Sequence, residues 1–328
     1  MLVLTGDEIA GLLAVDALID ALGPAMADLS AGRASVPDRI GAVVPGVDGR
    51  LMAMPGYVPS QGSLVTKLVS VFPRNAGTAL PTHQAIIVVF DPATGAPAAL
   101  LDGTVITAVR TGACTALSTR MLAREDASVL ALLGTGVQAR SHARAVSRVR
   151  PVHEIRVAGR NASRAESLAA ELQKELDVEV RAVDSYREAM AGAHIVCATT
   201  HPSDPVVRRE WLDPGTHVTS VGWSPTGREV DDATVAEALV CVESRRVALA
   251  PISAAGSPDL AEPLRKGILS EDLIVELGEL VAGTRPGRTS PDQITLYKSV
   301  GVAVQDATAA TLVLSAARRA GAGRDLAL

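Results

Sequence analysis

Residues 128–146 read SVLALLGTGVQARSHARAV. An apolar run typical of a buried strand is followed by the turn Gly134-Thr135-Gly136 and then by a helical pattern that starts at Val137. In such a turn the first glycine permits the sharp bend, the second lets the backbone approach a phosphate, and the helix N-terminus faces the negative charge. Ala139 stands where the third glycine of the fingerprint can be alanine. The alternative is an ordinary strand-to-helix turn, but the flanking pattern favours a dinucleotide site.

The next strand ends in VAGRNASRAE, residues 157–166. A site for NAD usually has an Asp or Glu here, which bonds the ribose hydroxyl. This chain has Arg160, Asn161 and Arg164 instead, and these side chains suit a 2′-phosphate better than a free hydroxyl. We therefore expect NADP(H) in preference to NAD(H), which stays possible. The alternative is that both arginines are only solvated at the start of a helix.

Apolar strand patterns alternate with helical patterns from Ser128 onward, and this alternation predicts a doubly wound parallel sheet in an α/β fold. The predicted strands are VLALLG, HEIRVAG, EVRAV, HIVCATT, THVTSVG and ALVCVE. Two of them end at residues with short side chains, Thr199 and Gly222, where parallel strands leave room for a cofactor ring. Simple loop composition would give the same residues.

The first third of the chain follows another pattern. Helical periodicity over residues 5–31 gives way to the strand patterns DRIGAVV, LMAMPGYV and LVTKLVSVF and to a hairpin that turns at residues 91–95. A helical pattern covers residues 104–123, and a final one over residues 297–320 is too apolar to stand alone and is expected to return to the first domain. We predict a mostly antiparallel α+β domain, residues 1–123 with 297–328, and a dinucleotide domain, residues 124–296.

Composition excludes several classes of protein. A net charge of −5 and an aromatic content of 2% argue against binding of nucleic acid. No apolar run approaches the twenty or so residues of a membrane span, and MLVLTGDEIAGLL lacks the basic start of a secretory signal, so a cytoplasmic location is expected. The three cysteines and six histidines are scattered, so neither a disulfide framework nor a metal site is predicted.

Three cations interrupt apolar segments of the first domain, namely Arg39, Lys67 and Arg110. A buried charge needs a partner, and few acids lie nearby in sequence, so an anionic ligand could provide it. The arginines suit bidentate binding of a carboxylate, and Lys67 suits a point charge or a proton donor. For each cation taken alone, a salt bridge to an Asp elsewhere in the chain is the simpler explanation.

At these residues the sequence resembles the ornithine cyclodeaminase and mu-crystallin family. The resemblance extends over nearly the whole chain, through VPDRI, MAMPGYV, VTKLVSVFPRN, the segment 80–113, GTGVQA, VGWSPTGREVD and KSVGVAVQD. It implies a Rossmann domain and a first domain that binds substrate and joins two chains into a homodimer. It assigns carboxylate binding to Arg39, Lys67 and Arg110. Further assignments are a nicotinamide contact for Thr82, the phosphate turn for Gln138, and a place beside the nicotinamide for Ser299, Val300 and Gly301.

Two positions depart from the cyclodeaminases, which carry acids where this chain has Met52 and Ser224. Those acids handle the distal amine of ornithine, so the resemblance is closer to ketimine reductases and mu-crystallin. We therefore predict an NAD(P)H-dependent reductase of a small imine with an α-carboxylate, or the reverse amino-acid oxidation. Ser224 would lie at the substrate. Lys67 is the first choice for the proton donor and His83 the second, although His83 could equally be structural.

Rivals stay open at this point. An ornithine cyclodeaminase would recycle bound NAD without net redox change, and an alanine- or arginine-type dehydrogenase would act on another amino acid. A protein that stores cofactor and a small acid, as mu-crystallin resemblance permits, represents another class. A short-chain dehydrogenase is disfavoured because the chain has no Tyr-x-x-x-Lys, and a methyltransferase because Arg160 and Asn161 replace the acid that it would need.

Overall fold

The computed structural model describes residues 1–224, 227–254 and 256–327. The chain forms two compact units, of which unit 1 comprises Met1–Arg110 and Gly301–Leu328 and unit 2 comprises Thr111–Val300. The division therefore falls inside helix α3 (Gly103–Leu122) and directly after residue 300, whereas the sequence placed it at residues 123/124 and 296/297.

Unit 1 contains a mainly antiparallel sheet with the strand order β15-β1-β6-β5-β4-β3-β2. All the strands that the sequence predicted in this region are present, and two short ones, β1 and β15, are added at the edge. β1 pairs with β6 in parallel, and the other neighbouring strands are antiparallel. The strands are β1 Leu2–Leu4, β2 Ile40–Val44, β3 Gly49–Val58, β4 Ser63–Val71, β5 His83–Phe90, β6 Pro97–Asp102 and β15 Arg324–Asp325.

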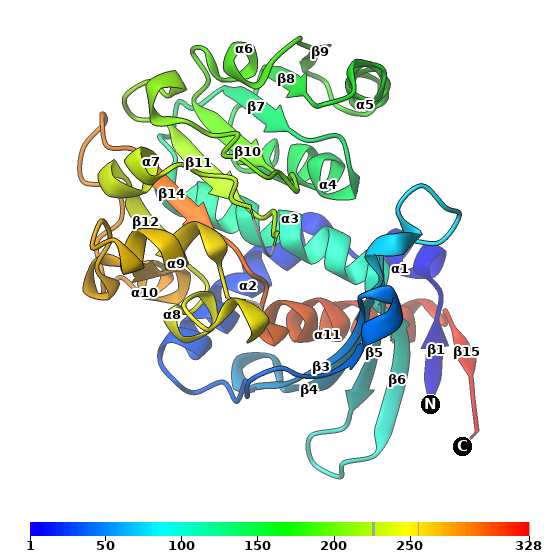
Figure 1. The fold of residues 1–328 in the computed structure, drawn as a ribbon. Helices are drawn as coiled ribbons and strands as arrows, with labels where there is room; N and C mark the ends of the chain where they lie inside the picture. The colour runs from blue at the N-terminus through cyan, green and yellow to red at the C-terminus, as the bar shows by residue number, and fades with distance from the viewer. Residues whose placement is uncertain (225–226, 255, 328) are drawn as a thin grey trace. The chain divides into compact units, whose positions relative to one another are not determined.

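Two long helices cover one face of this sheet (Figure 1). Helix α11 (Ala303–Ala320) packs on β3 and β4 and against α2 (Val15–Ser30), so the C-terminal helix completes unit 1. Short 3₁₀ turns join the strands at Pro45–Val47, Pro59–Gln61 and Pro73–Asn75. The β5–β6 hairpin turns as predicted, because the Asp91 carboxylate accepts hydrogen bonds from the backbone N–H groups of Ala93 and Thr94.

The sequence predicted one N-terminal helix over residues 5–31, and this is wrong. Two helices form, α1 (Gly6–Leu12) and α2, because Leu13 and Ala14 between them are extended. Thr5 starts α1 through a capping box with Glu8. Among the described residues no single helix is long and apolar enough to cross a membrane; α1 and α2 meet that test only as a pair bent by 83°.

Unit 2 is a doubly wound α/β domain, which confirms the predicted fold class. Its sheet has the order β13-β12-β14-β11-β10-β7-β8-β9, and every strand pair in the described part is parallel. Figure 1 shows β7, β10, β11 and β14 side by side. The strands are β7 Val129–Leu133, β8 Glu154–Ala158, β9 Glu179–Ala182, β10 Ile195–Ala198, β11 His217–Ser220, β12 Leu239–Val242, β13 Val275–Glu276 and β14 Thr295–Lys298.

Helices connect these strands, as parallel pairing requires. The α-helices are α4 Val137–Val146, α5 Ala162–Glu175, α6 Tyr186–Met190, α7 Asp232–Glu237, α8 Arg245–Ala248, α9 Pro258–Arg265 and α10 Leu277–Val281. Shorter 3₁₀ segments are Arg209–Trp211, Ile252–Ala254 and Glu271–Leu273. The strands β7 and β10 are wholly buried, so they form the centre of the core.

The predicted final helix over residues 297–320 is wrong in its first turns. Residues 295–298 form β14, which pairs with β11 on one side and β12 on the other, and the helix begins only at Ala303. Gly301 lies between them with a φ of 71°, a left-handed conformation that ends the strand and precludes an early helix start. The apolar residues of β14 fit the helical period of the segment that follows, so the sequence pattern did not show the short strand as a separate element.

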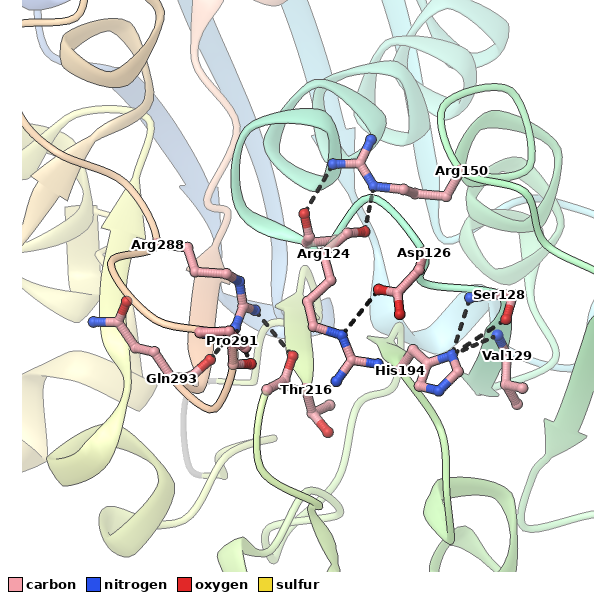
Figure 2. A network of polar contacts seen from close by, with 12 residues as sticks. Arg124, Asp126, Ser128, Val129, Arg150, His194, Thr216, Arg288, Pro291 and Gln293 are labelled. Carbon is pink, nitrogen blue, oxygen red and sulfur yellow. Dashed lines mark hydrogen bonds and ion pairs between the residues drawn. The ribbon is translucent and has the colours of Figure 1, made fainter.

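Arginines secure the C-terminal end of α3 in unit 2 (Figure 2). Arg150 donates a hydrogen bond to the carbonyl oxygen of Arg124, beside which it lies in Figure 2. It also donates to the carbonyl oxygens of Arg120 and Ala123, and Arg288 donates to that of Leu122. These carbonyls have no acceptor role inside the helix, and cations at a helix C-terminus also complement its dipole. The two arginines thus fix the chain at the point where it enters β7.

Candidate active site

Strand β4 presents Lys67 on the covered face of the sheet in unit 1. Ser63, Val65, Lys67 and Val69 alternate as buried residues along the strand, with partly exposed residues between them. The period of two places every second side chain on one face. Lys67 is 2% exposed, so its ammonium lies under helix α11 with little access to bulk water.

Asp306 of α11 pairs with two of the predicted substrate cations. Its Oδ2 lies 2.7 Å from Lys67 Nζ, and its Oδ1 accepts a hydrogen bond of 3.1 Å from Arg110 Nε. The Asp306 side chain is fully buried, and those of Lys67 and Arg110 are only 3% and 6% exposed. One carboxylate therefore holds the lysine and the arginine together, which is the salt bridge to a distant Asp that the sequence offered as the simpler explanation for each cation.

Arg39 lies close to this group from the start of β2. Its guanidinium donates a hydrogen bond to the carbonyl oxygen of Gly301, and its charge acts on Lys67. The backbone of Gly301 also lies close to Arg110. A Cβ at this position would be 2.8 Å from Arg110 Nη1, so only glycine leaves room for the guanidinium. The cluster of Arg39, Lys67, Arg110 and Asp306, hereafter the cation cluster, has three cations and one carboxylate, so it still attracts an anion.

Burial lowers the pKa of Lys67 to about 8. The Asp306 carboxylate opposes this shift, and the positive charges of Arg110 and Arg39 add to it. Burial disfavours ionisation of Asp306 as well, but Arg110 and Lys67 outweigh it and hold the pKa of Asp306 below its usual value. Near neutral pH the lysine is a protonated donor that gives up its proton readily, as a general acid requires.

The structure does not bring His83 to the cation cluster along the sheet. In the β4–β5 register Lys67 pairs with Ile87, whereas His83 pairs with Val71, four residues further along. At about 3.3 Å per residue this is a separation of roughly 13 Å. His83 is exposed, and its Nδ1 lies 3.2 Å from the Thr82 hydroxyl, so Thr82 and His83 form a local pair at the start of β5.

The glycine turn of unit 2 has the geometry that a pyrophosphate needs. Gly134 has a φ of 114°, and a Cβ there would lie 2.6 Å from Thr199 Oγ1. A Cβ at Gly136 would meet nothing within 4 Å, so space is open at the N-terminus of α4. The buried Oε1 of Gln138 has no hydrogen-bond partner in the described part of the chain. The turn therefore fits a dinucleotide, together with Thr135 and the exposed Val137.

The end of β8 presents Arg160, Asn161 and Arg164 as exposed residues. The Asn161 side chain accepts a hydrogen bond of 2.9 Å from the backbone N–H of Arg164, so it caps helix α5. This explains Asn161 by local structure, since Asn is a favoured N-cap residue. The two arginines are in solvent at the site predicted for a ribose phosphate.

The carboxyl ends of β10 and β11 converge on a carboxylate that the sequence reasoning missed. Glu229, 1% exposed, accepts hydrogen bonds from Thr200 and from the backbone N–H of Gly222. Thr199 itself donates to the carbonyl oxygen of Leu133 in β7. Ser224, which follows β11, accepts a hydrogen bond of 3.2 Å from the Gly227 N–H in unit 2.

Glu243 organises the end of β14 in a similar way. It accepts hydrogen bonds from the Ser299 hydroxyl, at 2.5 Å, and from the backbone N–H of Val300, at 3.1 Å. Of the three acids Asp306, Glu229 and Glu243, only Asp306 lies inside an otherwise apolar segment, which is the one sequence signal that could have drawn attention to it. The partners of Asp306 and Glu243 lie far away in the chain, so these pairings were not predictable from the sequence. Among the described residues no group of three His, Cys, Asp or Glu side chains could hold a metal ion.

A model of the ornithine cyclodeaminase/mu-crystallin family matches residues 1–321. The ketimine reductase mu-crystallin of Mus musculus is 36% identical over 300 residues, which are 90% of this chain and 90% of that protein. A delta(1)-pyrroline-2-carboxylate reductase of Bacillus cereus is 32% identical over 326 residues, 98% of each chain. The solved structure of the Thermococcus litoralis delta(1)-pyrroline-2-carboxylate reductase, in complex with NADH and L-proline, is 37% identical with a TM-score of 0.94, covering 99% of this chain and 100% of that one.

Proposed function

This chain belongs to the ornithine cyclodeaminase/mu-crystallin family, and we infer that it is a nicotinamide-dependent oxidoreductase acting on the C=N or CH–NH bond of a small α-imino or α-amino acid. The observation that carries this inference is the cation cluster, a buried site with a net positive charge that contains a potential proton donor. Such a site binds a small carboxylate and can protonate an atom beside it.

We propose the following roles for the residues of unit 1. Arg39 and Arg110 bind the substrate carboxylate, and Lys67 donates a proton to the imine nitrogen. A bound reduced nicotinamide supplies the hydride that the imine carbon accepts, so the C=N double bond becomes CH–NH. Asp306 keeps Lys67 beside Arg110, which places the proton next to the bound carboxylate.

For the cofactor we propose NADP(H), supported by the exposed Arg160 and Arg164 at the end of β8 and by the lack of an acid at Asn161. We further propose a homodimer formed through the outer face of the unit 1 sheet, and a cytoplasmic location. Ser224 and Met52 stand where a cyclodeaminase would have acids, so we propose net reduction and no release of ammonia from ornithine.

Purified protein should oxidise NADPH in the presence of pyrroline-2-carboxylate or piperideine-2-carboxylate, and the loss of absorbance at the nicotinamide band measures the rate. It should release little or no proline and ammonia from ornithine. Arg110→Ala should abolish imine reduction and leave NADPH binding nearly intact, because the guanidinium is assigned to the substrate and not to the cofactor. Arg33→Ala, which removes an exposed arginine paired with Asp28 in the same unit, is the control.

Efficient turnover of ornithine with catalytic NAD and no net change in absorbance would restore the cyclodeaminase alternative. Oxidation of alanine or arginine in preference to reduction of any cyclic imine would favour an amino-acid dehydrogenase. Tight binding of NADPH without activity towards any imine would favour a storage role.

A further inference from the structure

Buried charges collect at the carboxyl edge of the unit 2 sheet, where the proposed mechanism gives them no role. The buried charged residues nearest to the ends of β11, β12 and β14 are Glu229, Glu243, Asp259 and Lys298. All four are at most 2% exposed, and three of them are carboxylates. Charges are rarely buried without a purpose, because each loses its hydration.

Glu229 is satisfied by neutral donors alone in the described part of the chain. Its Oε1 accepts from the N–H of Thr200 at 2.6 Å and from the Thr200 hydroxyl at 2.7 Å. Its Oε2 accepts from the Ser220 hydroxyl at 2.7 Å and from the N–H of Gly222 at 2.8 Å. Four donors stabilise the carboxylate but leave its negative charge uncompensated.

Lys298 is committed to a different carboxylate. Its ammonium lies 2.8 Å from Asp259 Oδ2, and it donates to the Ser220 hydroxyl at 3.0 Å and to the Gly222 carbonyl at 2.6 Å. Asp259 in turn accepts from the N–H groups of Glu229 and Val230. Because Lys298 and Asp259 balance each other, the remaining charge of the network is that of Glu229.

The topology of the sheet places this charge at the nicotinamide half of a bound dinucleotide. The chain runs outward from β7 through β8 to β9 and then resumes at β10 on the opposite side of β7, which is the switch point of a doubly wound sheet. The phosphate turn follows β7, and the predicted ribose-phosphate residues follow β8. The other half of the cofactor therefore belongs at the carboxyl ends of β10, β11 and β14, which Glu229 and Glu243 hold.

We propose that Glu229 and Glu243 make unit 2 favour the oxidised, positively charged nicotinamide over the reduced, neutral one. A negative charge in a buried site attracts the cationic ring and is nearly indifferent to the neutral ring. Relative stabilisation of the oxidised form makes the bound reduced cofactor a stronger hydride donor. The inference rests on the proposed function only in requiring that the chain binds a nicotinamide dinucleotide.

The dissociation constants of NADP⁺ and NADPH, and likewise those of NAD⁺ and NADH, test this without any imine substrate. The quantity to compare is the dissociation constant of the oxidised form divided by that of the reduced form. Glu229→Gln removes a negative charge that attracts the oxidised ring, so it should raise this ratio by on the order of tenfold. Glu243→Gln should change the ratio in the same direction. Lys298→Met removes the opposite charge and should lower the ratio. Calorimetric titration measures all four constants on folded protein.

Glu154→Gln is the matched control, because this carboxylate begins β8 at the opposite edge of the same sheet and is paired with Arg156 and Arg181. It should leave the ratio unchanged. If Glu229 and Glu243 only stabilise the strand ends, their variants bind the oxidised and the reduced form more weakly by the same factor. The ratio then stays unchanged, which overturns the proposal. Should Glu229→Gln fail to fold, as shown by its melting curve, Glu243→Gln decides. Wild-type protein that binds neither form contradicts the proposed function itself.

Discussion

Asp306 illustrates how one buried residue can define a site. Its two oxygens hold Lys67 and Arg110, which come from β4 and from α3 and are separated by more than forty positions in the chain. A buried pair that loses one partner is strongly destabilised, typically by about 3–5 kcal/mol. The residue therefore has a structural role, and its charge also raises the pKa of Lys67.

Replacing Asp306 with Asn should shift the alkaline limb of the pH profile of kcat/KM. Lys67 acts as an acid only below its pKa of about 8, and the Asp306 carboxylate raises that pKa against the effect of burial. Without it the pKa falls, so activity is lost at a lower pH, by about one unit or more. Stopped-flow rates between pH 6 and 9 measure the limb.

Asp28→Asn is the control for this prediction, since Asp28 is a buried carboxylate of the same unit whose partners are Arg33 and Ser60. If the alkaline limb of the Asp306→Asn profile lies at the same pH as that of the wild type, the proton donor is a group other than Lys67.

Arg160 permits a second prediction at the scale of one residue. Arg160→Ala should weaken binding of NADPH much more than that of NADH, because it removes a charge-assisted hydrogen bond worth roughly 1.5–3 kcal/mol. Equilibrium titration with each nucleotide measures the difference. Arg144→Ala, which removes an arginine of α4 that is paired with Glu175 of α5, should affect neither affinity. Equal affinity of the wild type for NADH and NADPH would contradict the proposed preference.

At the scale of elements, the sequence predicted most strands and helices, and its errors lie in the first and last helical segments of the chain. The pattern at residues 129–146 gave β7 and α4 correctly, because a buried strand, a glycine turn and an amphipathic helix each leave a distinct mark. The four-residue strand β14 and the break at Leu13 left none, since tertiary pairing and packing decide them. For the same reason the cations of the site were recognisable in sequence, but their partner Asp306 was not.

Two buried histidines of unit 2, His142 and His217, make the stability of the fold depend on pH. His142 of α4 donates from Nδ1 to the Gln138 carbonyl and accepts at Nε2 from the Thr115 hydroxyl of α3, 2.9 Å away. Burial lowers the pKa of His142 to about 4 and that of His217 to about 3. Both rings are therefore neutral in the folded protein at pH 5, while in the unfolded chain they are largely protonated.

The free energy of unfolding should consequently fall as the pH drops from about 6.5 to about 4. The unfolded chain binds protons in this range that the folded protein does not, so each histidine contributes a slope of up to about 1.4 kcal/mol per pH unit. Urea titrations at pH 4.5 to 7.5 should show a shallower slope for His142→Gln. The exposed His153, replaced in the same way, is the control. An unchanged slope in His142→Gln would refute the assignment.

At the scale of the whole molecule, the outer face of the unit 1 sheet bears an apolar row. Ile40, Ala53, Leu68 and Ile86 are successive cross-strand neighbours on β2, β3, β4 and β5. Ile40 is 69% exposed and Ile86 44%, and Leu51 beside the row is 48% exposed. Contiguous apolar surface of this kind marks an interaction site, and a second copy of the chain is the occupant that the family resemblance predicts.

We expect light scattering to give a dimer at micromolar concentration, and Ile86→Lys to give a monomer, because a buried charge at the centre of an apolar contact is costly. Leu273→Lys is the control, since Leu273 is 61% exposed in unit 2 and should not affect assembly. A monomeric wild type would contradict the proposed dimer. A dimeric Ile86→Lys variant would show that the dimer contact lies on another surface.

The division of unit 1 into two stretches of chain has a consequence for biosynthesis. Unit 2 is continuous from Thr111 to Val300, so it is synthesised after the first stretch of unit 1 and before the second. Unit 1 therefore lacks α11 until the whole of unit 2 has been synthesised, and with it lacks the carboxylate that pairs with Lys67 and Arg110. We expect Lys67 and Arg110 to stay hydrated until then, so that the cation cluster forms only after unit 2 has been synthesised.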